Sequence, residues 1–360
     1  MLDDLYTLLA GELPSNVVWR ADLSFWLSGH PEIAKTVCAS EESYLEFHQS
    51  LGVMPYYYYD KFWAFDSIYD GSVRVKTGSE GFTSYRQITT PIGELREETR
   101  YLPQSFCSGI TRHFVTNELE LDTLLYVLDH TSYAPANIDD YSTRKQLWSK
   151  YGGIPCLGLP RSPLSSLCCE WAGIQTLSWL LIDAEDKVLA ALNRMEELET
   201  PILEAIGELA PPLVHFPDNL TSDIYTGLYD LHMAERHRKR LSHLHSNGVA
   251  CAVHLDGSVK GMLPKLSKTG FDAVEALTPK PAGDITLGQM SSLSQREETI
   301  LWGGVPGVMF APPFTWKDME KHIGDVLESW AGRRCILGVA DQVPPDGNVE
   351  WCRKISQLVK

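Results

Sequence analysis

The segment Gly248-Val-Ala-Cys-Ala-Val253 is followed directly by His254-Leu-Asp-Gly257. A short apolar run that ends in polar residues is typical of a strand buried on both faces of a parallel sheet. The second half of the chain contains five further runs of this kind, at 154–160, 212–216, 271–279, 300–305 and 336–340. The pattern predicts a parallel sheet with polar side chains at the carboxyl ends of its strands.

Segments of helical length separate these runs. In 183–206 the apolar residues recur three and four positions apart, which is the spacing of one buried helix face. The segments 223–245, 316–330 and 350–359 have the same pattern. Repeated strand–helix units favour a TIM-type (β/α)8 barrel of the α/β class over a doubly wound sheet.

The N-terminal part of the chain is less regular. The residues 16–19 predict a first strand and 53–59 a second. The segment 72–116 alternates as β-ribbons do and contains the turn Thr90-Pro-Ile-Gly93. We interpret 72–116 as a β-rich insertion over the barrel mouth, within a single domain that spans 1–360.

Composition and charge exclude several classes of protein. Of the 360 residues 44% are hydrophobic and 22% charged, which is the balance of a globular protein rather than a disordered one. The formal net charge of −16 disfavours nucleic acid and anionic lipid as partners. Asp3 and Asp4 stand where a signal peptide needs basic residues, and no apolar run approaches ~18 residues. We therefore expect a cytoplasmic protein that binds a small molecule.

A barrel places its active site at the carboxyl ends of the strands. The polar residues at these predicted ends are Arg20, Asp22, Arg161, Ser162, Asp218, Asn219, His254, Asp256 and Asp341. His254 and Asp256 are two positions apart, so in a strand they share a face and can bind a metal or act as an acid–base pair. A purely structural hydrogen bond is the alternative. Arg20 and Asp22 repeat the spacing with opposite charges, which also suits a salt bridge.

With these residues identified, the chain resembles the uroporphyrinogen decarboxylase superfamily over nearly its whole length. That superfamily contains the haem-pathway decarboxylase and the cobamide-dependent methyltransferases, all on a TIM-type barrel. The segments that carry the resemblance are 18–26, 89–93, 218–225, 254–257, 276–284 and 337–346.

Two departures from the decarboxylase pattern concern its substrate carboxylates. The decarboxylase has an R-Q-A-G-R-Y loop whose guanidinium groups hold them. Here the corresponding segment, Trp19-Arg-Ala-Asp-Leu-Ser-Phe-Trp26, has one arginine and gains Asp22. Asp341 also stands where the decarboxylase has a glycine-flanked histidine. Both departures argue against a substrate that carries many carboxylates.

The superfamily's thiol methyltransferases bind zinc through H-x-C and a distant cysteine. The resemblance places His254, Asp256 and Asp341 at these three ligand positions. Two carboxylates in place of thiolates make a harder site, suited to a divalent metal with bound water, for which zinc is our first expectation, or to metal-free acid–base chemistry. Because the chain lacks a D-x-H-x-x-G corrinoid motif, any corrinoid would come from a separate carrier protein or as free cofactor.

The resulting hypothesis is a methyltransferase. It would move a methyl group from a small O- or N-methylated compound to a corrinoid, or from a corrinoid to a non-thiol acceptor. The residues expected to act are Asp22, His254 and Asp341 in catalysis, Arg20, Asp218, Asn219 and Arg161 in substrate binding, and His254, Asp256 and Asp341 in metal binding. The alternatives are a decarboxylase of uroporphyrinogen or another carboxylated substrate, with Asp22 as proton donor, and a non-catalytic ligand-binding barrel.

Overall fold

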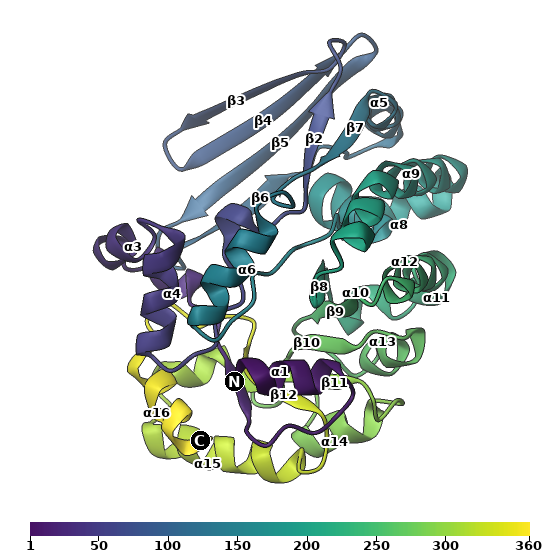
Figure 1. Ribbon diagram of the computed structural model, residues 1–360. Coiled ribbons are helices and arrows are strands. Elements are labelled where there is room, and N and C mark those ends of the chain that lie inside the picture. Colours follow the sequence, from purple (N-terminus) through teal and green to yellow (C-terminus); the bar gives the residue numbers. More distant parts are fainter.

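The computed structural model describes residues 1–360, which fold around a parallel sheet of six strands (Figure 1). In spatial order the strands are β1 (Val18–Arg20), β12 (Cys335–Ala340), β11 (Ile300–Pro306), β10 (Ala273–Leu277), β9 (Ala250–Leu255) and β8 (Leu213–Leu220). All neighbouring pairs are parallel. Each strand overlaps a predicted apolar run, so the prediction of an α/β fold with a parallel sheet is confirmed.

Two predicted strands, 53–59 and 154–160, are not regular strands. The segments contain Pro55, Pro155 and Pro160, which cannot donate a ladder hydrogen bond. Isolated bridges connect these segments to the sheet: Arg20 with Met54, Trp63 with Gly158, and Gly158 with His215. The regular sheet therefore has six strands instead of the eight expected, and a closed eight-stranded barrel stays a prediction.

Helices follow the strands in the second half of the chain and flank the sheet in Figure 1. They are α8 (Gly173–Asp183), α9 (Glu185–Leu209), α10 (Ser222–Tyr225), α11 (Tyr229–His232), α12 (Ala234–Ser246), α13 (Leu263–Thr269), α14 (Leu287–Leu293), α15 (Trp316–Ser329) and α16 (Glu350–Leu358). The single helix predicted over 223–245 is divided into three, with Gly227 at the first break, since glycine is a poor residue for a helix interior. No helix has the combination of length and apolar character needed to cross a membrane.

The N-terminal half contains shorter helices: α1 (Leu2–Leu9), α2 (Ser24–Ser28), α3 (Pro31–Val37), α4 (Glu41–Ser50), α5 (Glu118–Asp129), α6 (Tyr141–Lys150) and α7 (Pro163–Ser166). Short turns of other helix types are η1 (Tyr59–Lys61), η2 (Leu167–Ala172) and η3 (Gly307–Phe310). Helix α1 lies against the amino ends of the strands, where Leu5 and Leu8 are fully buried together with Val18 and Ile336. The amino ends of the sheet are therefore covered by apolar packing.

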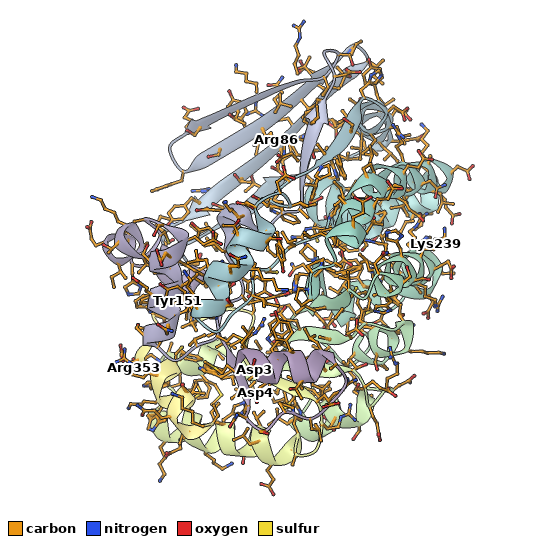
Figure 2. The ribbon with its side chains drawn as sticks, viewed as in Figure 1. Asp3, Asp4, Arg86, Tyr151, Lys239 and Arg353 are labelled. Carbon is orange, nitrogen blue, oxygen red and sulfur yellow. The ribbon has the colours of Figure 1, made fainter.

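The predicted β-rich segment forms a separate antiparallel sheet, at the top of Figure 1. Its strands are β3 (Arg74–Glu80), β4 (Thr83–Thr90), β5 (Gly93–Leu102) and β6 (Cys107–Arg112), and β2 (Phe65–Tyr69) pairs separately with β7 (Thr131–Pro135). Ile88 and Leu95 are fully buried where this sheet meets α5. Arg86 marks β4 in Figure 2. That this sheet covers a barrel mouth stays a prediction.

Basic residues of α12 are paired with acids of α9. Arg236 and Lys239 both contact Glu196 of α9, and Lys239 lies at the rim of the molecule in Figure 2. Arg240 lies 3.3 Å from Glu199, also on α9. These cations stabilise the contact between two helices and leave little uncompensated positive charge.

Candidate active site

A cavity of about 180 Å³ opens at the carboxyl ends of the sheet. Its lining residues come from strand ends that are far apart in the sequence and from the irregular segment that follows Met54. They are Asp22, Tyr57, Tyr59, Phe62, Trp63, Arg161, His215, Pro217, Asn219, His254, Glu275 and Asp341. This end of a parallel α/β sheet is where such folds place their active sites, so the cavity is the candidate active site.

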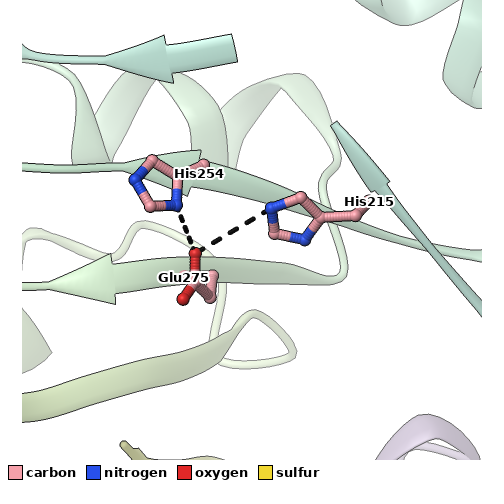
Figure 3. Close-up of side chains that lie close together, drawn as sticks. All are labelled: His215, His254 and Glu275. Atoms are coloured by element: carbon pink, nitrogen blue, oxygen red, sulfur yellow. Dashed lines mark hydrogen bonds and ion pairs between the residues drawn. The ribbon is translucent and has the colours of Figure 1, made fainter. Parts of the chain in front are cut away.

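His254 and Glu275 face each other across neighbouring strands. They are register partners of β9 and β10, and His254 Nδ1 lies 2.6 Å from Glu275 Oε2 (Figure 3). The pairing of β10 with β11 shifts between Val274 and Leu277, and Ala276 has a φ of 66°. Such an irregularity changes the direction of the side chains around it, here that of Glu275.

His215 completes a cluster with these two residues. It lies in β8, its side chain is 2% exposed, and its Nε2 is 3.9 Å from Glu275 Oε2 (Figure 3). One potential ligand atom from each of His215, His254 and Glu275 lies within 4.8 Å of the others. The sheet thus brings two imidazoles and one carboxylate together from three adjacent strands.

The protonation of the two histidines differs because their surroundings differ. Burial lowers the pKa of His215 well below its usual value, and the neighbouring His254 lowers it further. Burial also opposes the charge on His254, but the ion pair and hydrogen bond with Glu275 outweigh it and raise the pKa of His254 to about 9. At neutral pH the metal-free cluster therefore contains a neutral His215 beside an imidazolium–carboxylate pair.

Asp341 also lines the cavity, and its pKa lies close to neutral pH. Burial, together with the charges of Asp256, Glu275 and Asp22, raises the pKa of Asp341 to about 6 against the opposing charge of His254. A carboxyl with this pKa can both give and accept a proton at working pH. Asp341 and Asn219 also have left-handed backbone, with φ of 64° and 51°, a conformation that is uncommon outside glycine and clusters at functional sites.

The donor set fits a divalent cation. Two histidines and a glutamate form one of the ligand sets that catalytic zinc uses, with a further position open for water or substrate. His215 Nδ1 is buried without a hydrogen-bond partner, and neutral imidazole is the form that ligates metal. A cation on this cluster would replace the His254 proton as the charge that balances Glu275.

Five of the residues predicted from sequence line the cavity: Asp22, Arg161, Asn219, His254 and Asp341. Asp256 does not line it. Its carboxylate accepts a hydrogen bond from Gly257 N at 2.5 Å, and the residue follows the last residue of β9. The alternation that would place Asp256 on the face of His254 therefore ends before it. Glu275 is the carboxylate that the structure brings to His254.

Two other residues predicted to bind substrate are buried. Asp218 is fully buried and accepts hydrogen bonds from Ser162 N at 2.6 Å and from Ser162 Oγ at 2.8 Å, with His237 Nε2 at 2.9 Å, and it does not line the cavity. Arg20 is 2% exposed and does not line the main cavity. Its guanidinium carbon lies 4.2 Å from the ring centroid of Tyr56 and 4.7 Å from that of Trp302.

The expected salt bridge between Arg20 and Asp22 does not form, because no nitrogen of the Arg20 guanidinium has a hydrogen-bond partner. Asp22 accepts hydrogen bonds from Tyr59 at 2.6 Å, Gln342 at 3.0 Å and Ser24 at 2.7 and 2.9 Å. Four donors thus hold the Asp22 carboxyl group in one position in the cavity wall.

The sequence pattern did not identify His215, Glu275, Phe62 or Trp63, and in the run Tyr56–Tyr59 it predicted two core rings and two that line a pocket without assigning them. The signal for the first two was present, since each interrupts an apolar strand, in Leu213-Val-His-Phe216 and Ala273-Val-Glu-Ala-Leu277. Ionisable side chains are rarely buried in a strand unless they are paired or functional.

No protein-family model and no curated protein sequence matches the chain. Among solved structures, a methyltransferase from Methanosarcina mazei matches with a TM-score of 0.61 at 14% identity, covering 98% of this chain and 96% of that one. A B12-independent methionine synthase from a Shewanella species, solved with selenomethionine, matches with a TM-score of 0.46 at 9% identity over 73% of this chain and 72% of its own. The chain shares the fold of the first of these two proteins, and at 14% identity the match concerns the fold.

Proposed function

We propose that this protein is a methyltransferase that acts on a small O- or N-methylated compound, with a corrinoid from a carrier protein as the methyl acceptor. A divalent cation, zinc as the first expectation, would be held by His215, His254 and Glu275. The observation that carries the proposal is the convergence of these three side chains in the cavity of a fold shared with a methyltransferase.

The chemistry assigned to the lining residues follows from their charges. Bound zinc would supply a Lewis acid to an ether oxygen before transfer, or to an amine nitrogen once its methyl group has left and a lone pair is free. As the methyl group leaves for the acceptor, the heteroatom keeps the bonding electron pair, so an ether leaves as an alkoxide and a quaternary ammonium ion as a neutral amine, and Asp341 is placed to protonate either one. Asn219 provides a side-chain amide for orienting the substrate in the same cavity.

The lining favours methyl transfer over the two alternatives. Three carboxylates, Asp22, Glu275 and Asp341, face the cavity, and Arg161 lies 3.2 Å from Glu170, which neutralises it. A substrate with many carboxylates needs several free guanidinium groups, and this cavity offers none. A barrel that only binds its ligand has no use for an Asp341 with a raised pKa beside an imidazolium–carboxylate pair, whereas an enzyme does.

The test combines metal content with turnover. Plasma mass spectrometry of the purified protein should show one divalent ion per chain, lost in His254→Ala. Incubation with reduced free corrinoid and a panel of methylated amines and ethers should change the corrinoid absorbance, and Asp341→Asn should slow that change at least ~100-fold. If no compound of the panel methylates the corrinoid, and the protein releases carbon dioxide from a carboxylated substrate, the proposal is overturned in favour of decarboxylation.

A further inference from the structure

One segment supplies a continuous aromatic lining to the cavity. Tyr57, Tyr59, Phe62 and Trp63 all line it. The rings of Tyr57 and Tyr59 stack at 5.7 Å with planes 2° apart, while Phe62 meets Tyr59 at 5.6 Å and Trp63 edge-on at 5.0 Å. These contacts hold the rings in fixed positions. The cavity therefore presents pre-organised π-systems to whatever binds there.

The polar part of the lining carries excess negative charge. Its two cations are both paired, His254 with Glu275 at 2.6 Å, and Arg161 with Glu170. Asp22 and Asp341 have no cationic partner within salt-bridge distance, and Asp22 is hydrogen-bonded to the Tyr59 hydroxyl, so that an anion is fixed beside the aromatic rings. A divalent metal on the histidine cluster would still leave the carboxylates of the lining in excess.

Fixed aromatic rings together with carboxylates are the environment that recognises methylated ammonium ions. Such a cation spreads its charge over its methyl groups and is attracted by the ring quadrupoles. It has few or no N–H donors, so it needs no matching set of hydrogen-bond acceptors. Neutral ethers gain nothing from Asp22 or Asp341, and anions are repelled by them.

A buried cation already lies against aromatic rings directly beside the cavity. The Arg20 guanidinium lies over the rings of Tyr56 and Trp302, and none of its nitrogens has a hydrogen-bond partner. Arg20 shares a small hollow with Asp22, Glu275 and Asp341, which also belong to the main cavity lining. This end of the sheet therefore already places one cation against aromatic rings and near carboxylates.

We propose that the substrate of this site is a small methylated ammonium compound, bound between the aromatic segment Tyr57–Trp63 and the Asp22 and Asp341 carboxylates. This substrate class rests on the proposed function in taking the cavity as the methyl donor site. A volume of about 180 Å³ restricts the ligand to a few heavy atoms around the ammonium group.

Binding can be tested without turnover. Isothermal titration of the full chain, with and without added zinc, compares choline with 3,3-dimethylbutan-1-ol, its uncharged carbon isostere. Choline should bind saturably and at least ~10-fold more tightly than the isostere, as expected for a desolvated cation–π site. Equal affinity for the two compounds, or no binding of choline, would overturn the proposal.

Substitutions in the cavity lining test whether choline binds there. Trp63→Leu should weaken choline binding roughly 3- to 30-fold, Trp63→Phe should retain most of it, and Asp22→Asn should weaken it while leaving binding of the isostere unchanged. Trp179→Leu on α8, whose tryptophan is 61% exposed and lies outside the cavity, is the matched control and should change nothing. Circular dichroism checks that each variant is folded. Choline affinity that is insensitive to both Trp63→Leu and Asp22→Asn would also overturn the proposal.

The two proposals fail in different ways. Selective choline binding without methyl transfer to any corrinoid would leave the substrate class standing and contradict the methyltransferase. Methyl transfer from a neutral ether, without choline binding, would support the methyltransferase and contradict the cationic substrate.

Discussion

His254 Nδ1 lies 2.6 Å from Glu275 Oε2, and the two residues are register partners on adjacent strands. Their separation is thus set by the backbone ladder of β9 and β10 rather than by flexible loops. His215, one strand further along the sheet, is 3.9 Å from the same carboxylate oxygen. A cluster built on three neighbouring strands is rigid, which is what a metal site requires of its ligands.

Replacing the central carboxylate should abolish tight metal binding. Loss of even an outer partner of a metal ligand costs about 10- to 100-fold in affinity, so Glu275→Gln should weaken zinc binding by at least ~100-fold. Competition with a chelating dye measures the affinity. Glu298→Gln removes an exposed carboxylate outside the cavity and is the control. Unchanged zinc affinity in Glu275→Gln would remove this cluster from the metal hypothesis.

The two possible ligand sets can be separated directly. The sequence pattern predicts His254 with Asp256 and Asp341, whereas the structure groups His254 with His215 and Glu275. If the structural cluster is the site, Asp256→Asn and Asp341→Asn should keep one zinc per chain, and His215→Gln should lose it. Plasma mass spectrometry after dialysis decides the matter, and zinc retained by His215→Gln but lost from Asp256→Asn would favour the sequence-based set.

The hydrogen bonds to Asp218 should make the free energy of unfolding depend on pH in the acid range. Burial alone would raise its pKa, but hydrogen bonding to His237 and Ser162 and the charge of Arg240 lower the pKa to about 2. A carboxyl whose pKa is lower in the folded state stabilises the fold fully above its unfolded value near 4, and the contribution disappears as the pH falls through 2.

Asp218→Asn should therefore lower the free energy of unfolding at pH 7 by about 2 kcal/mol. The difference from the wild type should shrink between pH 4 and pH 2. Urea denaturation at several pH values measures it, with Asp223→Asn, an exposed aspartate of α10, as the control. A difference that is constant with pH would mean that Asp218 acts through packing rather than through its charge.

The sequence predicted those features that depend on local pattern. The apolar runs located the six strands, and the polar residues behind them located His254, Asn219 and Asp341 in the cavity. Glu275 could not be assigned to His254 in this way, because their contact depends on the register between two strands that are 21 residues apart in the chain. Sequence spacing suggested Asp256 instead, since it does not show that β9 ends at Leu255.

The N-terminal part was harder to predict for a different reason. The segments 53–59 and 154–160 contain prolines, which lack the backbone N–H that donates a hydrogen bond to a neighbouring strand. These segments therefore join the sheet only through isolated bridges. The aromatic residues in the first of them read equally well as core or as cavity lining. Tyr56 belongs to the core and Tyr59 to the cavity, a division that tertiary packing alone determines.

Two buried arginines should respond oppositely to the same substitution. Arg20 is 2% exposed with no hydrogen-bond partner, and burial lowers its pKa to about 10, whereas Arg144 is 4% exposed and donates to Glu41 at 2.8 Å. Replacing buried ionic groups by well-packed apolar side chains of similar volume is often neutral or stabilising, by about 1 to 4 kcal/mol, while removing one partner of a buried pair costs about 3 kcal/mol or more.

Arg20→Met should thus keep or raise the free energy of unfolding, and Arg144→Met should lower it, as measured by urea denaturation with unchanged m-values. Metal-free protein without added ligand is the state to use, because its cavity lining then carries only its own charges. If Arg20→Met loses as much stability as Arg144→Met, the Arg20 guanidinium must be compensated in solution by its neighbouring carboxylates.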